Sequence, residues 1–311
     1  MNGIRYNKGA ESRRGAELEL AIPNRSCVFP WLPASVVRVL PAFTLIELLI
    51  TVAIIALLLS ILAPALRGTI AASRTAKCLA NQRQLALAWS LYANDYHDRA
   101  VPAAYWQAEY IGSGPVVYWF GADSPDAAPS SGTLMPYIAT ARAERSALEC
   151  PEQAAGTYTP QTQNLKVSTT YGYNGYYLSP AMTPGWAGDI SFRPWRRTAD
   201  ITMPSELLVF ADTLLAGVNA TALPRSTALL DPPMLYSQNA GWQNNSSPTT
   251  AFRHGVKFKA NVAARADGSA AAATASQDLL QRDSKGRALG TGNLSKSPDP
   301  GYVPDWNEWK N

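Results

Sequence analysis

Residues Phe43–Leu66 read FTLIELLITVAIIALLLSILAPAL and contain a single charged side chain, that of Glu47. As an α-helix this run would be about 36 Å long, which is enough to cross a hydrocarbon core of roughly 30 Å. A buried helix of a soluble protein is the alternative, but an apolar run of this length favours a membrane span. We therefore predict a transmembrane helix at 43–66, with a bend or a local loss of helix where Pro64 interrupts it.

The segment before this run is basic. Residues 1–42 carry a net charge of +3, contributed by the basic residues Arg5, Lys8, Arg13, Arg14, Arg25 and Arg38 and the acidic residues Glu11, Glu17 and Glu19. Segments rich in Lys and Arg resist translocation, so we expect the N-terminus in the cytoplasm and the rest of the chain outside the inner membrane. A signal peptide has a shorter apolar core and a small-residue cleavage site after it, so we expect this helix to be retained.

Glu47 is energetically unfavourable within a membrane helix. A charged side chain at the bilayer centre costs about 2.5–3.5 kcal/mol on insertion scales, and such residues are usually paired and functional. Near the helix end the carboxylate could instead reach the cytoplasmic surface. That alternative explains why the charge is tolerated but not the residues around it.

The sequence Phe43-Thr-Leu-Ile-Glu47 followed by an apolar run resembles the prepilin signature of type IV pilins and type II secretion pseudopilins. The resemblance implies that a prepilin peptidase removes the leader 1–42 by cutting between Ala42 and Phe43, and that the new amino terminus of Phe43 is methylated. It also implies that Glu47 pairs with the amino terminus of a neighbouring subunit, and that Pro64 is the helix-bending proline of the family. Ala42 replaces the usual Gly, which implies slower cleavage, and the leader is long, so translation starting near Val36 is an alternative.

Residues 67–100 continue the helical pattern. Apolar side chains recur every three or four residues and share one helical face, formed by Leu85, Ala88, Trp89, Tyr92 and Tyr96. We expect this amphipathic segment to pack on an extracytoplasmic domain at 101–280, where the runs VVYWF, STTYGYNGYYLSP, ELLVFADT and HGVKFKANVAA alternate with turn residues, as in antiparallel sheets. The predicted fold class is α+β, a long N-terminal helix packed on an antiparallel β-sheet. The tail at 281–311 is predicted to be polar and partly flexible, with Trp306 and Trp309 anchoring its end.

A second resemblance rests on short motifs. The motifs KCLANQRQLALA from Lys77, Cys150-Pro, YGYN from Tyr171, FAD ending at Asp212, FRHG around His254, and Asp267-Gly268 are similar to a prepilin-like family abundant in planctomycetes and verrucomicrobia. That family carries a His-x9-Asp-Gly signature, whereas twelve residues separate His254 from Asp267 here. We predict a hydrogen-bonded pair of His254 and Asp267 across a hairpin, with a structural role rather than catalysis or metal binding.

Three cysteines and two histidines limit the metal and redox chemistry. Cys27 lies in the predicted leader, and Cys78 and Cys150 are expected to form a disulfide worth about 4–5 kcal/mol, or to remain two buried thiols. No zinc-ligand spacing such as H-E-x-x-H or C-x-x-C occurs, so no metal or cofactor is predicted. Calcium at Asp299 and Asp305 is kept as an alternative, although the spacing of an EF-hand is missing.

Three functions are compatible with this pattern. The first is a non-enzymatic pilin-like or pseudopilin-like subunit, whose partners are the prepilin peptidase, other subunits and the membrane. The second is a membrane-anchored module that binds a ligand such as a polysaccharide, for which an exposed cluster of Trp106, Trp119, Trp195 and Trp242 would be required. The third, a hydrolase using His254, lacks a G-x-S-x-G motif, and the absence of Lys/Arg blocks beside aromatics excludes nucleic acid as an expected partner.

Overall fold

The computed structural model describes residues 43–128, 131–138, 148–154, 156–161, 168–217, 222–255 and 259–310. The leader at 1–42, with Ala42 and Cys27, lies outside these residues. The chain divides after Ile55 into two compact units. Its elements are helices and antiparallel sheets, which confirms the predicted α+β class.

The first element, α1, is a helix of 51 residues that spans Leu45–Asp95. It includes most of both predicted helical segments and is continuous through Pro64, so no local loss of helix occurs there. It ends at Asp95 rather than at residue 100, because His97 and Asp98 have φ angles of 57° and 66° that a right-handed helix does not allow. Within the described residues, α1 is the one helix that is long and apolar enough to cross a membrane.

The side chains of α1 change environment along the helix. Every Phe, Leu, Ile and Val side chain from Phe43 to Ile70 is exposed, whereas Cys78 is the first buried residue of the helix. Of the predicted apolar face, Leu85, Ala88, Trp89 and Tyr92 are buried. Tyr96 is 48% exposed because it lies beyond the end of α1, where it stacks on Tyr92 with ring centroids 4.2 Å apart.

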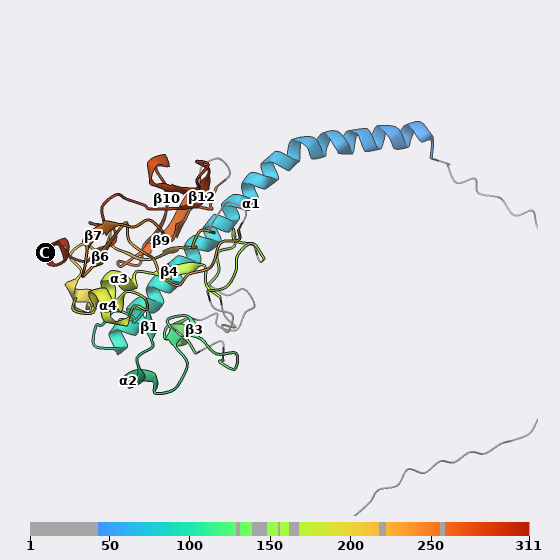
Figure 1. Ribbon diagram of the computed structural model, residues 1–311. Helices are drawn as coiled ribbons and strands as arrows, with labels where there is room; N and C mark the ends of the chain where they lie inside the picture. Colours follow the sequence, from blue (N-terminus) through green and yellow to red (C-terminus); the bar gives the residue numbers. More distant parts are fainter. Residues whose placement is uncertain are drawn as a thin grey trace, which may run out of the picture. The chain divides into compact units, whose positions relative to one another are not determined.

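We call the described residues that follow α1 the head. Its central sheet contains, in spatial order, β10 (Ala270–Thr274), β9 (Ala260–Arg265), β5 (Leu208–Asp212) and β4 (Tyr171–Tyr173). All neighbours in this sheet are antiparallel, and every residue of β5 is buried. In Figure 1 the C-terminal half of α1 runs beside β4 and β9, and Gln82 Nε2 of α1 donates to the carbonyl of Val262 in β9 at 3.3 Å.

The remaining strands form smaller antiparallel sheets. They are β1 (Ala104–Tyr105), β2 (Val117–Tyr118) and β3 (Gly121–Ala122) in one sheet, β11 (Leu280–Arg282), β12 (Ala288–Gly292) and β8 (Thr250–Ala251) in a second, and β6 (Met234–Ser237) with β7 (Gly241–Asn244) in a third. Short helices connect them: α2 (Ala108–Ile111), α3 (Gly175–Leu178), α4 (Ala187–Ile190) and α5 (Trp306–Trp309), with 3-10 turns η1 (Met135–Tyr137), η2 (Pro180–Met182), η3 (Thr198–Asp200) and η4 (Gln277–Leu279).

The C-terminal segment contains regular structure. It contains most of β11 and all of β12, and β12 pairs with β8 through Thr291 opposite Ala251. Tyr302 and Trp309 are fully buried. The predicted partial flexibility of this tail stays a prediction, and the burial of Trp309 is consistent with an anchor at its end.

Candidate metal centre

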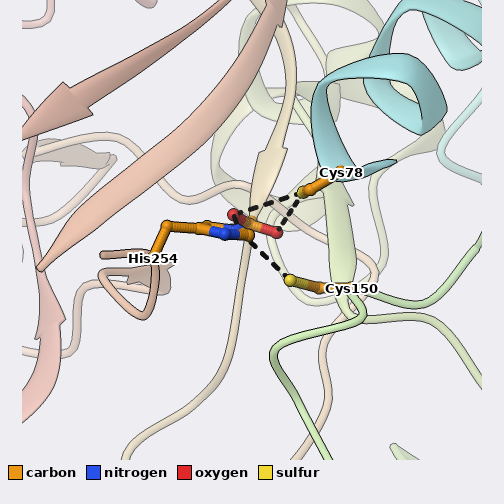
Figure 2. Close-up of side chains that lie close together, drawn as sticks. Cys78, Cys150 and His254 are labelled. Atoms are coloured by element: carbon orange, nitrogen blue, oxygen red, sulfur yellow. Dashed lines mark hydrogen bonds and ion pairs between the residues drawn. The ribbon is translucent and has the colours of Figure 1, made fainter. Parts of the chain in front are cut away.

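Four side chains that are distant in the sequence converge beside α1. They are Cys78 from α1, Cys150 from the loop before β4, Asp212 at the end of β5, and His254 after β8. One potential ligand atom of each lies within 4.8 Å of the others, and none of the four residues is more than 1% exposed. Figure 2 shows Cys78, Cys150 and His254 pointing toward one another.

The local structure explains how each residue is held. Cys150 donates its backbone N–H to Thr170 Oγ1 at 2.7 Å, which fixes the loop beside the start of β4. His254 exchanges two backbone hydrogen bonds with Ala260 at the start of β9, with N–O distances of 3.0 and 2.9 Å. Asp212 lies opposite Tyr171 in the register of β5 and β4. The cluster therefore joins α1 to the central sheet.

One nitrogen of His254 faces two of its partners. Nε2 lies 2.9 Å from Asp212 Oδ2 and 3.2 Å from Cys150 Sγ. A nucleophilic triad instead places the nucleophile on one imidazole nitrogen and the carboxylate on the other. Cys78 Sγ adds a second sulfur at 3.5 and 3.7 Å from the two carboxylate oxygens of Asp212. This arrangement, in which the polar atoms meet at one point, is typical of ligands around a cation.

A second layer of groups orients the four side chains. Tyr171 donates its hydroxyl to Cys78 Sγ at 3.4 Å, and the backbone N–H of Val262 donates to Asp212 Oδ2 at 3.1 Å. Arg253 Nη2 lies 4.0 Å from Asp212 Oδ1. Thr75 Oγ1 of α1 lies 3.3 Å from His254 Nδ1, the nitrogen that faces away from the sulfurs.

Burial and proximity shift the pKa values within the cluster. Burial raises the pKa of the Cys78 thiol, and the neighbouring Cys150 and Asp212 raise it further. Burial opposes the charging of Cys150 and His254 as well, but their hydrogen bonds outweigh this effect. Hydrogen bonds from Cys78 and His254 lower the pKa of Cys150. Hydrogen bonds to Asp212 and Cys150 raise the pKa of His254 to about 9. The lowered pKa of Cys150 and the raised pKa of His254 favour the charged forms of these two groups, whereas the raised pKa of Cys78 favours its neutral thiol.

The predicted pair of His254 and Asp267 is not formed. His254 bonds Asp212 instead, while Asp267 is exposed and its Oδ1 accepts the backbone N–H of Ser269 at 2.8 Å. Asp267 lies just before Gly268, which has a φ of 85° in the turn between β9 and β10. His254 pairs with the opposite end of β9, and the ends of this six-residue strand lie roughly 17 Å apart.

The sequence named two of the four residues together, as a cysteine pair. Cys78 and Cys150 are free, buried thiols, which is the arrangement kept as the alternative to a disulfide. The sequence predicts no role for Asp212, although a carboxylate at the end of the apolar run LLVFAD is a signal for a buried polar site. The lack of zinc-ligand spacing along the sequence does not exclude a metal site, because the fold brings together potential ligands from four separate segments.

The other predicted site residues lie apart from this cluster. Glu47 is in the first turn of α1, where Thr44 donates its N–H and its hydroxyl to Oε2, both at 2.8 Å, and Phe43 is exposed. Asp305 caps α5 by accepting the N–H of Asn307 at 2.9 Å. Among the described residues, Asp299 and Asp305 belong to no group with metal-ligand spacing.

The four tryptophans considered for ligand binding do not share one environment. Trp119 is fully buried and donates Nε1 to the carbonyl of Ala228 at 3.0 Å. Trp195 is partly buried and donates to Ala100, and Trp242 packs on Tyr236. Trp106 is 38% exposed. The burial of Trp119 and the partial burial of Trp195 and Trp242 favour a packing role for these three rings.

A scan of protein-family models and searches of curated proteins and of solved structures find no match to this chain.

Proposed function

We propose that this chain is a pilin-like structural subunit, anchored in the cytoplasmic membrane by the first part of α1 and without enzymatic activity of its own. The observation that carries the proposal is the contrast within α1: the apolar side chains from Phe43 to Ile70 are exposed, whereas one face of the helix after Cys78, with Leu85, Trp89 and Tyr92, lies in the core of the head. Exposed apolar surface costs about 25 cal/mol per Å² in water, so a run of this length needs lipid or other helices around it.

Processing would prepare this helix for assembly. Hydrolysis of the peptide bond between Ala42 and Phe43 by a prepilin peptidase consumes one water and leaves a carboxylate on Ala42 and a free amine on Phe43. Transfer of a methyl group from a sulfonium donor to that amine, with loss of a proton, would give N-methylphenylalanine. The retained product then begins two residues before α1.

Glu47 supplies the acceptor for a neighbouring amine in this proposal. Both hydrogen bonds from Thr44 reach Oε2 of the exposed carboxylate, which leaves Oε1 to accept from a partner. A carboxylate accepts about four hydrogen bonds, so the intrahelical pair does not exhaust it. In lipid, an amine and a carboxylate that meet in this way relieve the desolvation cost of both charges.

Intact-mass spectrometry of the membrane form tests the processing step. In a host with an active prepilin peptidase, we expect the mass of a chain that starts at Phe43 and carries one added methyl group. Replacing Ala42 by Gly should keep this product, and Ala42→Glu should abolish it. An unprocessed wild-type chain in that host would refute the proposed processing.

Substitution at Glu47 tests assembly. Glu47→Gln should leave membrane insertion unchanged and reduce crosslinked or sedimentable assemblies by about tenfold, since the charge is lost and the shape is kept. Glu109→Gln, at an exposed position of α2, is the matched control and should assemble like the wild type. Equal assembly of the wild type and the Glu47 variant would contradict the pairing role.

A further inference from the structure

We infer that Cys78, Cys150, Asp212 and His254 bind a zinc ion that fastens α1 to the head. The inference rests on the geometry of the cluster alone and is independent of whether the chain assembles into a filament. Membrane anchoring and processing could therefore fail their tests while the zinc site passes its own.

The spacing of the four side chains matches a tetrahedral ion. With Zn–S distances of about 2.3 Å and Zn–N or Zn–O distances of about 2.0–2.1 Å, neighbouring ligand atoms lie about 3.3–3.8 Å apart. The separations here are 2.9 Å from His254 to Asp212, 3.2 Å from His254 to Cys150, and 3.5 Å from Cys78 to Asp212. The other three separations are at most 4.8 Å, so shifts of up to about 1 Å would complete the tetrahedron.

The hydrogen bonds of Thr75 select the imidazole tautomer that a metal requires. Thr75 Oγ1 donates its proton to the carbonyl of Ala71 at 3.0 Å, so its lone pairs accept from His254 Nδ1–H. Nε2 of the neutral ring then presents a lone pair 2.9 Å from Asp212 Oδ2, which is itself an acceptor. Two acceptors at this distance repel each other unless a proton or a cation lies between them. A metal ion satisfies both.

The ligand set selects the ion. Two sulfurs and an imidazole suit Zn²⁺, whereas Ca²⁺ and Mg²⁺ require oxygen ligands. Four protein ligands, all buried, leave no open position, and this is typical of structural rather than catalytic zinc.

The charges also balance in the buried site. Two thiolates and the carboxylate of Asp212 carry three negative charges, which Zn²⁺ and the guanidinium of Arg253 offset when His254 is neutral. Uncompensated buried charges are strongly unfavourable, so the zinc form leaves the site neutral. Tyr171 and Val262 donate to Cys78 and Asp212, as outer groups do around metal ligands.

The first experiment uses the wild-type full chain in detergent, purified under reducing conditions without chelator. We expect elemental analysis to find about one zinc per chain. After removal of the zinc, Co²⁺ should produce the visible absorption of a tetrahedral thiolate complex, and added Zn²⁺ should displace it and raise the unfolding midpoint. A wild-type chain that binds neither ion would overturn the inference, whatever the variants do.

Matched variants assign the ligands. Cys78→Ser, His254→Asn and Asp212→Asn should each lower Zn²⁺ affinity by tenfold or more, at least the loss caused by changing an outer-layer partner. The controls change the same residue types elsewhere: His97→Asn and Asp267→Asn should keep the zinc. Asn tolerates the left-handed backbone of His97. Unchanged zinc content in the three ligand variants would place the ion elsewhere and overturn the assignment.

The redox state of the cysteines provides an independent reading. The chain is isolated without reductant and then unfolded in the presence of a thiol-blocking reagent. Both Cys78 and Cys150 should then carry the blocking group. A disulfide between them, seen as a mass two units lower and two unmodified cysteines, would exclude zinc ligation by the pair and overturn the inference.

Discussion

The packing of α1 on the head leads to a prediction based on two leucines of the same helix. Leu85 is 0% exposed in the main core, whereas Leu87, two residues later on the opposite face, is 60% exposed. Leu→Ala in a core costs 2–5 kcal/mol, so Leu85→Ala should destabilise the chain by about 3 kcal/mol. Leu87→Ala should change the stability by no more than about 0.5 kcal/mol.

Thermal unfolding of the full chain in detergent measures this difference. For a domain of this size, 1 kcal/mol shifts the unfolding midpoint by about 2–4 °C, so Leu85→Ala should lower it by about 6–12 °C. Tryptophan fluorescence is a suitable signal because Trp89 and Trp119 are buried in the same core. Leu87→Ala should remain within about 2 °C of the wild type.

The two substitutions control for each other. Both replace Leu by Ala inside one helix, so the change in helix propensity is the same for both and cancels in the comparison. Only the loss of contacts with the head differs. Equal midpoints for the two variants, or a lower midpoint for Leu87→Ala, would refute the packing of this face of α1 on the head.

Two further predictions concern the head alone. Burial raises the pKa of Asp231 to about 7, so the folded chain retains a proton that the unfolded chain loses above about pH 4. The contribution of Asp231 to the free energy of unfolding should therefore fall by about 1.4 kcal/mol per pH unit from about pH 4 to pH 7. Denaturant titrations at several pH values should show that this slope disappears in Asp231→Asn. A Cβ at Gly172 would lie 2.7 Å from the carbonyl oxygen of Leu229, so Gly172→Ala should lower the free energy of unfolding by about 1–3 kcal/mol. Gly188→Ala is the control, because a Cβ at Gly188 meets nothing within 4 Å. Similar denaturation midpoints for the two variants would contradict the steric clash at Gly172.

The sequence predicted the elements whose pattern is local. The apolar run from Phe43 and the three- and four-residue spacing of Leu85, Trp89 and Tyr92 predict a helix, and α1 contains both. The strand β5 lies inside the run ELLVFADT because a short apolar segment bounded by turn residues is a local signal. The end of α1 was placed too late because the left-handed backbone at His97 and Asp98 has no marker such as Gly.

The candidate metal centre depends on contacts that no local pattern contains. Cys78 and Cys150 could be proposed as neighbours because cysteines often pair, but their approach to Asp212 and His254 follows from the register of β4, β5 and β9. The partner of His254 was predicted by its position in a motif, and the length of β9 removes Asp267 from reach. To predict the site from the sequence, the pairing of β4, β5 and β9 would have to be known first.

The position of the cluster along α1 connects the zinc inference with the proposed function. Cys78 is the first buried residue of the helix, and the contacts of Arg74 with Glu152 and of Thr75 with His254 lie within one turn before it, so the cluster lies where the exposed apolar part of α1 ends and the contacts with the head begin. Packing contacts such as those of Leu85 and Trp89 lie further along the helix. A hydrogen bond contributes about 1 kcal/mol net, whereas four bonds to a zinc ion resist separation together. If both proposals hold, a zinc ion bound by Cys78 would join the membrane-anchored helix to the head close to this transition.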